Sequence, residues 1–432
     1  MRRRALPVIY LSVFVDMLGF GIILPLLPFH AERLGGSGLW VGGVLTAYAA
    51  AQFVAAPVLG ALSDRYGRRP VLLAALAGSA ISLTLTGLAG SLVTLLAARL
   101  IAGLFGGAIP VGQAYVVDLT EPQERTRALG LVGASIGMGF VFGPAIGAAL
   151  SGLGFAGVSF VAGGIALANL IVGWALLPKH VLLPKHTAPA LADRATPETP
   201  EFPKTPTTPA TPAAPGHDAP TPTRRGSSPA LLATALRVRA LRPVLIAIFA
   251  AMFAFAGMET TYALLGGRLY GLGPAGLGLV FTGVGVVVAI VQGGLVGKVS
   301  ARYGDRRVAV AGTLMVGLGL AVLPLGVAWL NYAGLVALAA GQGLMTTTTA
   351  ALIAELGASA LGGSFGVGQS ASAAARATGP IAAGVVFDIN LGLPFYLGAC
   401  LCAAAALLLH LGTRTHAATA PPLRVVKDGQ TA

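Results

Sequence analysis

The chain has 432 residues, of which 55% are hydrophobic and only 10% are charged, and it contains 61 glycines. This composition excludes a soluble enzyme with a polar shell and predicts a polytopic membrane protein. A net charge of +13 would suit nucleic acid, but no compact basic region with interleaved aromatic residues occurs, so we expect no nucleic-acid partner.

Apolar runs of about 20 residues, long enough to cross a hydrocarbon core of about 30 Å, recur along the chain. The first follows the basic start MRRR, but it is too long for a signal peptide and no small-residue cleavage site follows it, so we expect a retained span. The predicted spans, in chain order, are 7–29, 39–62, 70–89, 92–117, 127–151, 155–177, 243–267, 275–298, 307–328, 331–355, 363–387 and 392–411.

The basic residues fall on one side of this predicted topology. With the N-terminus inside, 24 of the 28 lysines and arginines lie in inner segments, and the outer loops keep only Arg33 and Arg268. This is the positive-inside distribution, and it predicts a multi-pass protein of the cytoplasmic (inner) membrane with both termini in the cytoplasm.

A Pro/Thr-rich segment divides the chain into two halves of six spans. Residues 196–229 read TPETPEFPKTPTTPATPAAPGHDAPTPTRRGSSP and lack apolar periodicity, which is typical of a disordered linker. We therefore predict an all-α protein with a six-helix bundle over 1–178, a cytoplasmic linker over 179–242, a second six-helix bundle over 243–412 and a cytoplasmic tail over 413–432.

Neither the histidines nor the cysteines of the chain form a recognisable site. His180 and His186 belong to the duplicated stretch LLPKHVLLPKH, which we interpret as a slipped repeat at a helix exit rather than a metal site. Cys400 and Cys402 are two residues apart in one span and therefore point to different faces of a helix. The sequence predicts neither a metal nor a cofactor, and it carries no nucleotide-binding or hydrolase motif, so we expect no enzyme.

The two halves are related by internal duplication. GALSDRYGRR at 60 matches GKVSARYGDRR at 297, Gly103 matches Gly341, and the Gly-Pro pair at 143 matches the one at 379. The three offsets are 237, 238 and 236 residues. Two parallel six-span halves predict a binding site near the midplane between them and alternating access by rocking of one half against the other.

These motifs resemble the major facilitator superfamily, in particular its twelve-span drug:proton antiporter branch. GALSDRYGRRPVLL at 60–73 is similar to the signature of the loop between spans two and three. DMLGFGIILPLLP from Asp16 resembles the first-span motif, and LAARLIAGLFGGA, which contains Arg99, resembles the fourth-span motif. GFVFGPAIGA at 139–148 resembles the antiporter signature of span five, with Ala148 in place of the last glycine.

The loop signature predicts a gating latch made of Gly60, Asp64, Gly67, Arg68, Arg69 and Asp118. Gly60 is expected to let helices approach closely, and Asp64 can bind Arg68 and face the positive N-terminus of a neighbouring helix. The resemblance implies that this neighbour is the eleventh span and that Asp118 completes the network. The second copy has Ala301 at the position of Asp64, so we expect asymmetric gating. The alternative is a basic loop that only sets topology.

Four charged residues lie inside predicted spans, where a charge costs about 2.5 to 3.5 kcal/mol on insertion scales and is usually functional. Each half has one acid and one arginine: Asp16 and Arg99 near the midplane, Glu259 and Arg376 further outward. We predict that they couple proton exchange to substrate occupancy, with Asp16 as the proton carrier. The alternative is a pair of static neutralising contacts that hold the spans together.

Two further groups of residues complete the predicted machinery. Gly139, Gly143 and Gly147 form a stripe on one helix face, and Pro144 bends the helix, which favours close and bendable packing.

Polar or aromatic residues on the spans expected to line the cavity suggest a mostly apolar substrate pocket. These substrate-binding candidates are Tyr48, Gln52, Gln113, Tyr262, Gln292, Gln342 and Gln369.

The sequence thus predicts a monomeric secondary transporter that exchanges protons for amphipathic small molecules, including drugs, across the lipid bilayer. A proton-coupled symporter or uniporter that imports a metabolite would share the fold. A membrane sensor or scaffold without transport is the alternative from another functional class.

Overall fold

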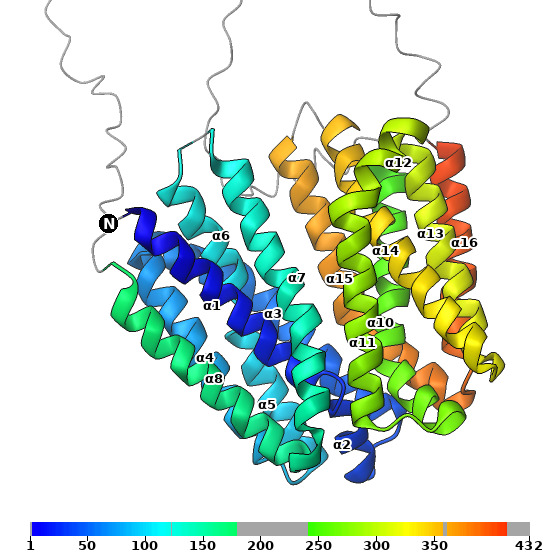
Figure 1. Cartoon of the computed structure of the whole chain (residues 1–432), viewed down its shortest axis with the longest axis horizontal. Coiled ribbons are helices and arrows are strands. Elements are labelled where there is room, and N and C mark those ends of the chain that lie inside the picture. Colours follow the sequence, from blue (N-terminus) through cyan, green and yellow to red (C-terminus); the bar gives the residue numbers. More distant parts are fainter. Residues whose placement is uncertain (1, 122, 179–240, 357–360, 413–432) are drawn as a thin grey trace, which may run out of the picture.

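The computed structural model describes residues 2–121, 123–178, 241–356 and 361–412, and these form two helical bundles that stand side by side (Figure 1). The predicted tail, and the predicted linker up to residue 240, lie outside the described residues. Apolar runs become helices because a backbone inside hydrocarbon must satisfy its own hydrogen bonds.

Each bundle follows the predicted order of spans. The helices of the first half are α1 (Arg2–Ile23), α2 (Leu27–Arg33), α3 (Gly38–Tyr66), α4 (Arg68–Gly87), α5 (Leu92–Leu104), α6 (Ala108–Leu119), α7 (Arg125–Leu150) and α8 (Gly154–Leu176). Those of the second half are α10 (Arg242–Tyr270), α11 (Pro274–Ile290), α12 (Val296–Tyr303), α13 (Asp305–Val322), α14 (Ala328–Leu356), α15 (Leu361–Ile389) and α16 (Leu393–Gly412).

Twelve spans are present among the described residues. Ten helical runs are long and apolar enough to cross a membrane. One of them, Arg127–Leu176, contains both α7 and α8, and the 29-residue helix α15 is additional to the ten. The prediction of an all-α membrane protein with two six-helix halves is therefore confirmed.

Several spans are interrupted at specific residues. The fourth span breaks between α5 and α6 at residues 105–107, and Pro57 lies inside α3. The eighth span consists of α11 and α12 joined by one π-helical turn, Val291–Leu295. The turns that follow α3 and α12 are made by Gly67 and Gly304, with φ of 96° and 81°, a conformation that favours glycine. This explains why both copies of the loop motif keep that glycine.

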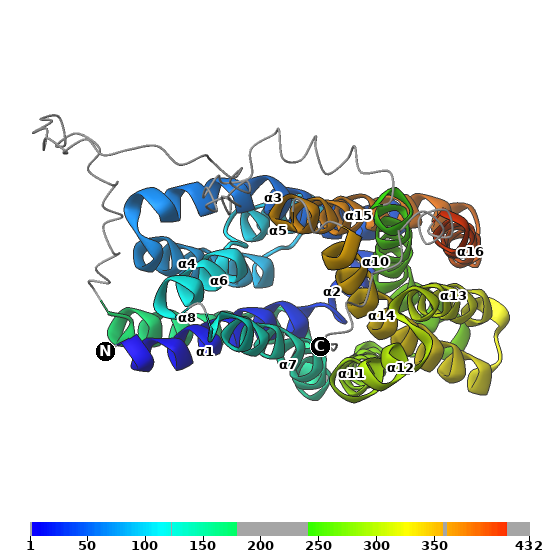
Figure 2. The same cartoon turned by 90° about the horizontal axis from the view of Figure 1, so that it is seen from above.

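The bundles pack together through two pairs of helices. Figure 2 shows α3 beside α15 and α7 beside α11. The second and eleventh spans thus meet on one side of the molecule, and the fifth and eighth meet on the other, as expected for two halves related by duplication.

The two ends of the molecule differ. We call the end that carries Gly67, Gly304 and their neighbouring arginines the basic end, and the end that carries α2 the opposite end. One hydrophobic cluster joins both halves and includes Leu27 and Val41 from the first half and Phe387 from the second. The clusters nearer the basic end each belong to a single half. The halves are therefore fused by apolar packing at the opposite end.

Candidate functional site

Asp16 and Arg99 lie together inside the first half. The Ser79 hydroxyl donates a hydrogen bond to Asp16 Oδ1 at 2.7 Å, and Arg99 Nη2 donates to the Thr86 hydroxyl at 2.5 Å. Arg99 is only 3% exposed, and its Nε has no hydrogen-bond partner within the described part of the chain. No ion pair within 4.0 Å joins Asp16 to Arg99. Each side chain is thus held by a neutral hydroxyl instead of by the other charge.

Both residues line a small cavity together with Phe20 and Tyr48. Its volume is about 30 Å³, which suffices for one or two water molecules and not for an organic compound. The wall is polar on the side of Asp16, Ser79 and Arg99, so the arrangement can hold a proton and water next to a carboxylate.

Tyr48 connects this cavity with the second half. Its hydroxyl oxygen accepts a hydrogen bond from Gln52 Nε2 at 3.3 Å, and its ring stacks on Phe20 with centroids 5.0 Å apart. Asp16, Arg99 and Arg376 all interact electrostatically with this hydroxyl. Arg376, on α15, interacts in the same way with Glu259 on α10. The four predicted intramembrane charges therefore form one electrostatically connected group that crosses from one half to the other.

The acid and the arginine of the second half, Glu259 and Arg376, are not joined by an ion pair. No ion pair within 4.0 Å joins Glu259 to Arg376, and no hydrogen bond to either side chain occurs within the described residues. The Arg376 side chain is exposed and Glu259 is half-buried. The static neutralising contact considered from the sequence is thus absent between these two residues.

At the basic end, Arg68 connects two acids. Arg68 Nη1 lies 2.5 Å from Asp64 Oδ1, and its Nε donates to Asp118 Oδ2 at 2.8 Å. Arg68 Nη1 also donates to the Ser63 hydroxyl at 2.6 Å. Asp64, Arg68 and Asp118 are therefore brought together as the sequence predicts, and Arg69 Nη2 donates to the Trp174 carbonyl oxygen at 2.6 Å.

Gly60 makes no close helix contact in this structure. A methyl group added to Gly60 would meet no atom within 4 Å, because the close approach of α3 to α15 occurs at the opposite end. The Asp64 side chain is 68% exposed. In the second copy of the motif, Ser300 donates a hydrogen bond to Asp305. Asp305 directly follows the turn at Gly304, at the position that Arg68 occupies in the first copy.

The antiporter-type stripe packs closely against α1, a partner that the sequence did not indicate. A methyl group on Gly139 would lie 2.5 Å from Met17 Cβ, and one on Gly143 would lie 2.7 Å from Gly21 Cα. Gly147 is similarly close to the Ile22 carbonyl oxygen. Glycine allows these two helices to touch at three positions over about two turns.

Two equivalent glycine contacts join the halves. Gly42 of α3 touches the carbonyl of Pro380, and a methyl group on Gly278 of α11 would lie 2.7 Å from the carbonyl oxygen of Pro144. Gly278 follows Gly42 by 236 residues, and Pro380 follows Pro144 by the same number. We did not predict this contact from the sequence, although the shared offset of the Gly-Pro pairs was a signal that could have identified it.

Charged side chains reinforce the closure at the opposite end. The backbone N–H groups of Gly38 and Leu39 donate to the two carboxylate oxygens of Asp388 at 2.7 and 2.9 Å. Asp388, at the end of α15, thus binds the exposed N–H groups at the start of α3. Arg268 forms an ion pair with Glu32 at 3.3 Å and lies over the Phe387 ring. None of these contacts was predicted from the sequence.

The substrate-binding candidates separate into three groups. Tyr48 and Gln52 lie beside the charged group, and the side chains of Gln113, Gln292 and Gln369 are exposed. Tyr262 is fully buried and shares hydrogen bonds with Asn331, and Gln342 is buried with its Nε2 directed at the Met252 sulfur. The prediction that Tyr262 and Gln342 line the pocket is therefore wrong, because the core of the second half encloses them.

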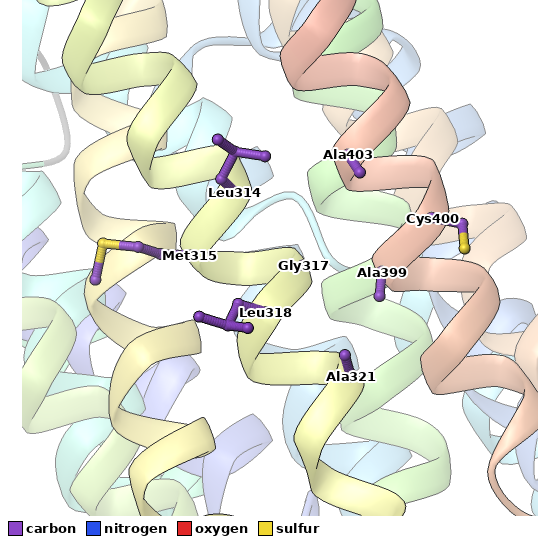
Figure 3. A pocket seen from close by; sticks show the side chains of 8 residues that line it. All are labelled: Leu314, Met315, Gly317, Leu318, Ala321, Ala399, Cys400 and Ala403. Atoms are coloured by element: carbon purple, nitrogen blue, oxygen red, sulfur yellow. The ribbon is translucent and has the colours of Figure 1, made fainter.

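A larger hollow lies elsewhere and is unsuited to binding a polar group. It is an apolar groove between α13 and α16, on the side of the second half that faces away from the first (Figures 1 and 3). Figure 3 shows that its lining is aliphatic apart from the sulfur atoms of Met315 and Cys400. Cys400 is exposed and Cys402 is buried, so the two cysteines do point to different faces as predicted.

Comparison with known proteins identifies relatives across most of the chain. A family model described as Major Facilitator Superfamily matches residues 9–297 and 268–428. Major facilitator superfamily domain-containing protein 10 of Bos taurus is 28% identical, covering 98% of this chain and 94% of the relative. A class G tetracycline resistance protein of Vibrio anguillarum is 29% identical, covering 88% and 90%. Among solved structures, the human organic anion transporter MFSD10 (TETRAN) matches with a TM-score of 0.62 and 24% identity, covering 94% of this chain and 99% of that one.

Proposed function

Because the chain belongs to the major facilitator superfamily, whose members it matches in both sequence and fold, we propose that this membrane transporter works as a proton-coupled exporter of amphipathic small molecules. The observation that carries the proposal is the water-sized cavity around Asp16. A carboxylate held by a neutral hydroxyl and facing water can take up and release a proton without breaking an ion pair.

The proposed direction, export, rests on the similarity to tetracycline and multidrug resistance proteins. The two halves meet at the opposite end, and the basic end is cytoplasmic if the positive-inside rule holds. With the basic end cytoplasmic, the contacts between the halves lie at the outer end of the molecule. The similarity to tetracycline resistance proteins supports drugs as one class of cargo. In this proposal the transporter acts as a monomer in the cytoplasmic membrane.

The test is transport in inside-out membrane vesicles with an imposed pH gradient. Addition of a transported compound should release protons from the vesicle lumen, and the compound should accumulate only while the gradient lasts. Proton movement in the same direction as the compound would indicate symport and would refute export. A panel of amphipathic drugs in an efflux-deficient host would supply the compounds for this assay.

A further inference from the structure

We propose that the apolar groove between α13 and α16 binds one acyl chain of an anionic phospholipid, whose phosphate group pairs with Arg307 at the basic end. This lipid site goes beyond the proposed transport function and does not depend on the direction or the coupling of transport. Two features of the second half carry it: the groove itself and an arginine on the same face of α13.

The groove is formed by small residues that lie between larger aliphatic side chains. A methyl group on Gly317 of α13 would lie 3.1 Å from the Ala399 carbonyl oxygen, so α13 and α16 approach closely along the floor. Leu314 and Leu318 are exposed on the α13 side, and α16 contributes only short side chains such as that of Ala403 (Figure 3). The volume is about 540 Å³, and it opens away from the first half. Both helices are spans, so the medium that fills this hollow is the hydrocarbon of the bilayer.

Arg307 lies on the face of α13 that carries the groove. It precedes Leu314 by seven residues, which places the two side chains within about 20° of each other around the helix axis. Ala311, about one turn from each of them, is exposed. Only a methyl group therefore lies between the guanidinium and the groove along this line of the helix.

The charge of Arg307 is available to a ligand. Its side chain is exposed and has neither a hydrogen bond nor an ion pair among the described residues. The neighbouring Arg306 instead donates to the His410 carbonyl oxygen and so joins the start of α13 to the end of α16. Asp305, the acid at the start of α13, accepts a hydrogen bond from Ser300. A guanidinium group keeps its charge and can bind a phosphate group through two parallel hydrogen bonds, so an anionic headgroup is the complementary partner.

The spacing along α13 fits one leaflet of a bilayer. At 1.5 Å per residue, the groove residues Leu314 and Ala321 lie about 10 and about 21 Å from Arg307 along the helix. Half of a bilayer with its headgroups is about 20 to 22 Å thick. A phospholipid with its phosphate at Arg307 would thus lay the end of one acyl chain along the groove. The headgroup and the chain of the same lipid would each have a place on the protein.

The experiment uses the full-length transporter in proteoliposomes with a trace of phosphatidylglycerol or of phosphatidylcholine, both with the same photoactivatable acyl chain. After illumination, lipid attached to peptides from 314–321 and 399–403 is quantified relative to a peptide that contains Ile171, an exposed residue of α8. We expect phosphatidylglycerol to label the groove about fivefold more than phosphatidylcholine. Arg307→Gln should remove this difference, and Ala403→Phe, which fills the groove, should lower labelling by both lipids.

Each of these variants has a matched control. Arg127 is, like Arg307, the exposed third residue of a helix, so Arg127→Gln removes the same charge away from the groove. Ala404 is exposed beside Ala403 but does not line the groove, so Ala404→Phe adds the same ring outside it. Both controls should keep the labelling of the wild-type protein.

Equal labelling of the groove by the two lipids in the wild-type protein would overturn the proposal, and so would equal effects of a variant and its control. If Arg307→Gln or Ala403→Phe does not fold, the comparison of the two lipids on the wild-type protein decides. A dimer that is lost in Ala403→Phe, together with an unlabelled groove, would identify a second copy of the chain as the occupant and refute the lipid site.

Discussion

Among the intramembrane charges, Asp16 has the surroundings expected of a proton carrier. Among the described residues its one hydrogen bond comes from Ser79, and the cavity beside it has room for one or two water molecules but not for cargo. Asp16→Asn should abolish accumulation driven by a pH gradient and spare substrate binding, because asparagine keeps the hydrogen bond but cannot exchange a proton. Transport against an imposed gradient, with binding measured separately, checks this.

The companion variant for this prediction is Glu259→Gln, which should change the range of accepted substrates instead of the coupling. Glu259 has no hydrogen bond or ion pair within the described residues and is electrostatically linked to Arg376. If Asp16→Asn still concentrates a substrate in response to the gradient, the assignment of the proton to Asp16 is refuted and Glu259 becomes the first alternative carrier.

Asp64 is expected to matter for transport and little for stability. An exposed ion pair one turn apart on a helix contributes less than about 1 kcal/mol, and the Asp64 side chain is mostly exposed. Asp64→Asn should therefore insert and fold normally but lose most transport, because the anion is needed when the halves approach at the basic end. Expression, thermal stability and transport should be compared with Glu121→Gln, an exposed acid in the loop after α6. Normal transport by well-expressed Asp64→Asn would exclude the latch.

At the level of helices, the contacts of Gly42 and Gly278 determine how closely the halves approach at the opposite end. Gly42→Ala should hinder the approach of α3 to α15, because the added methyl group meets the Pro380 carbonyl. The transporter should then spend more time open at the opposite end, which cysteine accessibility there would report. Gly43→Ala is the matched control, since a methyl group on Gly43 meets nothing within 4 Å. Equal accessibility in the two variants would contradict this role of Gly42.

Asp388 stabilises the same contact by capping α3. Loss of a carboxylate cap costs about 1 kcal/mol, which corresponds to roughly a fivefold change in the ratio of two states. Asp388→Asn keeps only one acceptor oxygen, so we expect a longer mean distance between spin labels at Leu88 and Leu325, both exposed at this end. Glu32→Gln, which removes only the ion pair with Arg268, should have a smaller effect. The reverse order of these two effects would contradict the capping argument.

At the scale of the whole molecule, the linker predicted over 179–242 is expected to connect the halves without contributing a site. Removing residues 190–228 while keeping a flexible tether should leave transport nearly unchanged, because loop-closure entropy changes only slowly with length. Transport by the shortened protein should be compared with full-length protein at equal expression. If every spacer of sufficient length abolishes transport, the segment has a further role.

The spans, the two halves and the charged residues could be predicted because each depends on a local pattern in the sequence. The spans follow from the length of the apolar runs, the halves from the Pro/Thr-rich segment between them, and the charged residues from the rarity of charges inside such runs. The sequence did not predict at which end the halves meet. In the proposed alternating access the halves would also meet at the basic end, so the contacts of Gly42 and Asp388 would belong to one of two arrangements. Burial of Tyr262 was also missed, because its partner Asn331 lies 69 residues away.

The π-helical turn in the eighth span marks a difference of one residue between the two copies of this helix. From helix cap to helix cap, Ser37 to Gly67 spans 30 positions, whereas Gly273 to Gly304 spans 31. A π turn absorbs one additional residue without breaking the helix. Pro57 of α3, moved by the 237-residue offset, falls on Gly294 inside this turn. One copy therefore loses a backbone hydrogen bond at a proline, and the other accommodates an inserted residue at the matching position, so both helices are weakened at the same height.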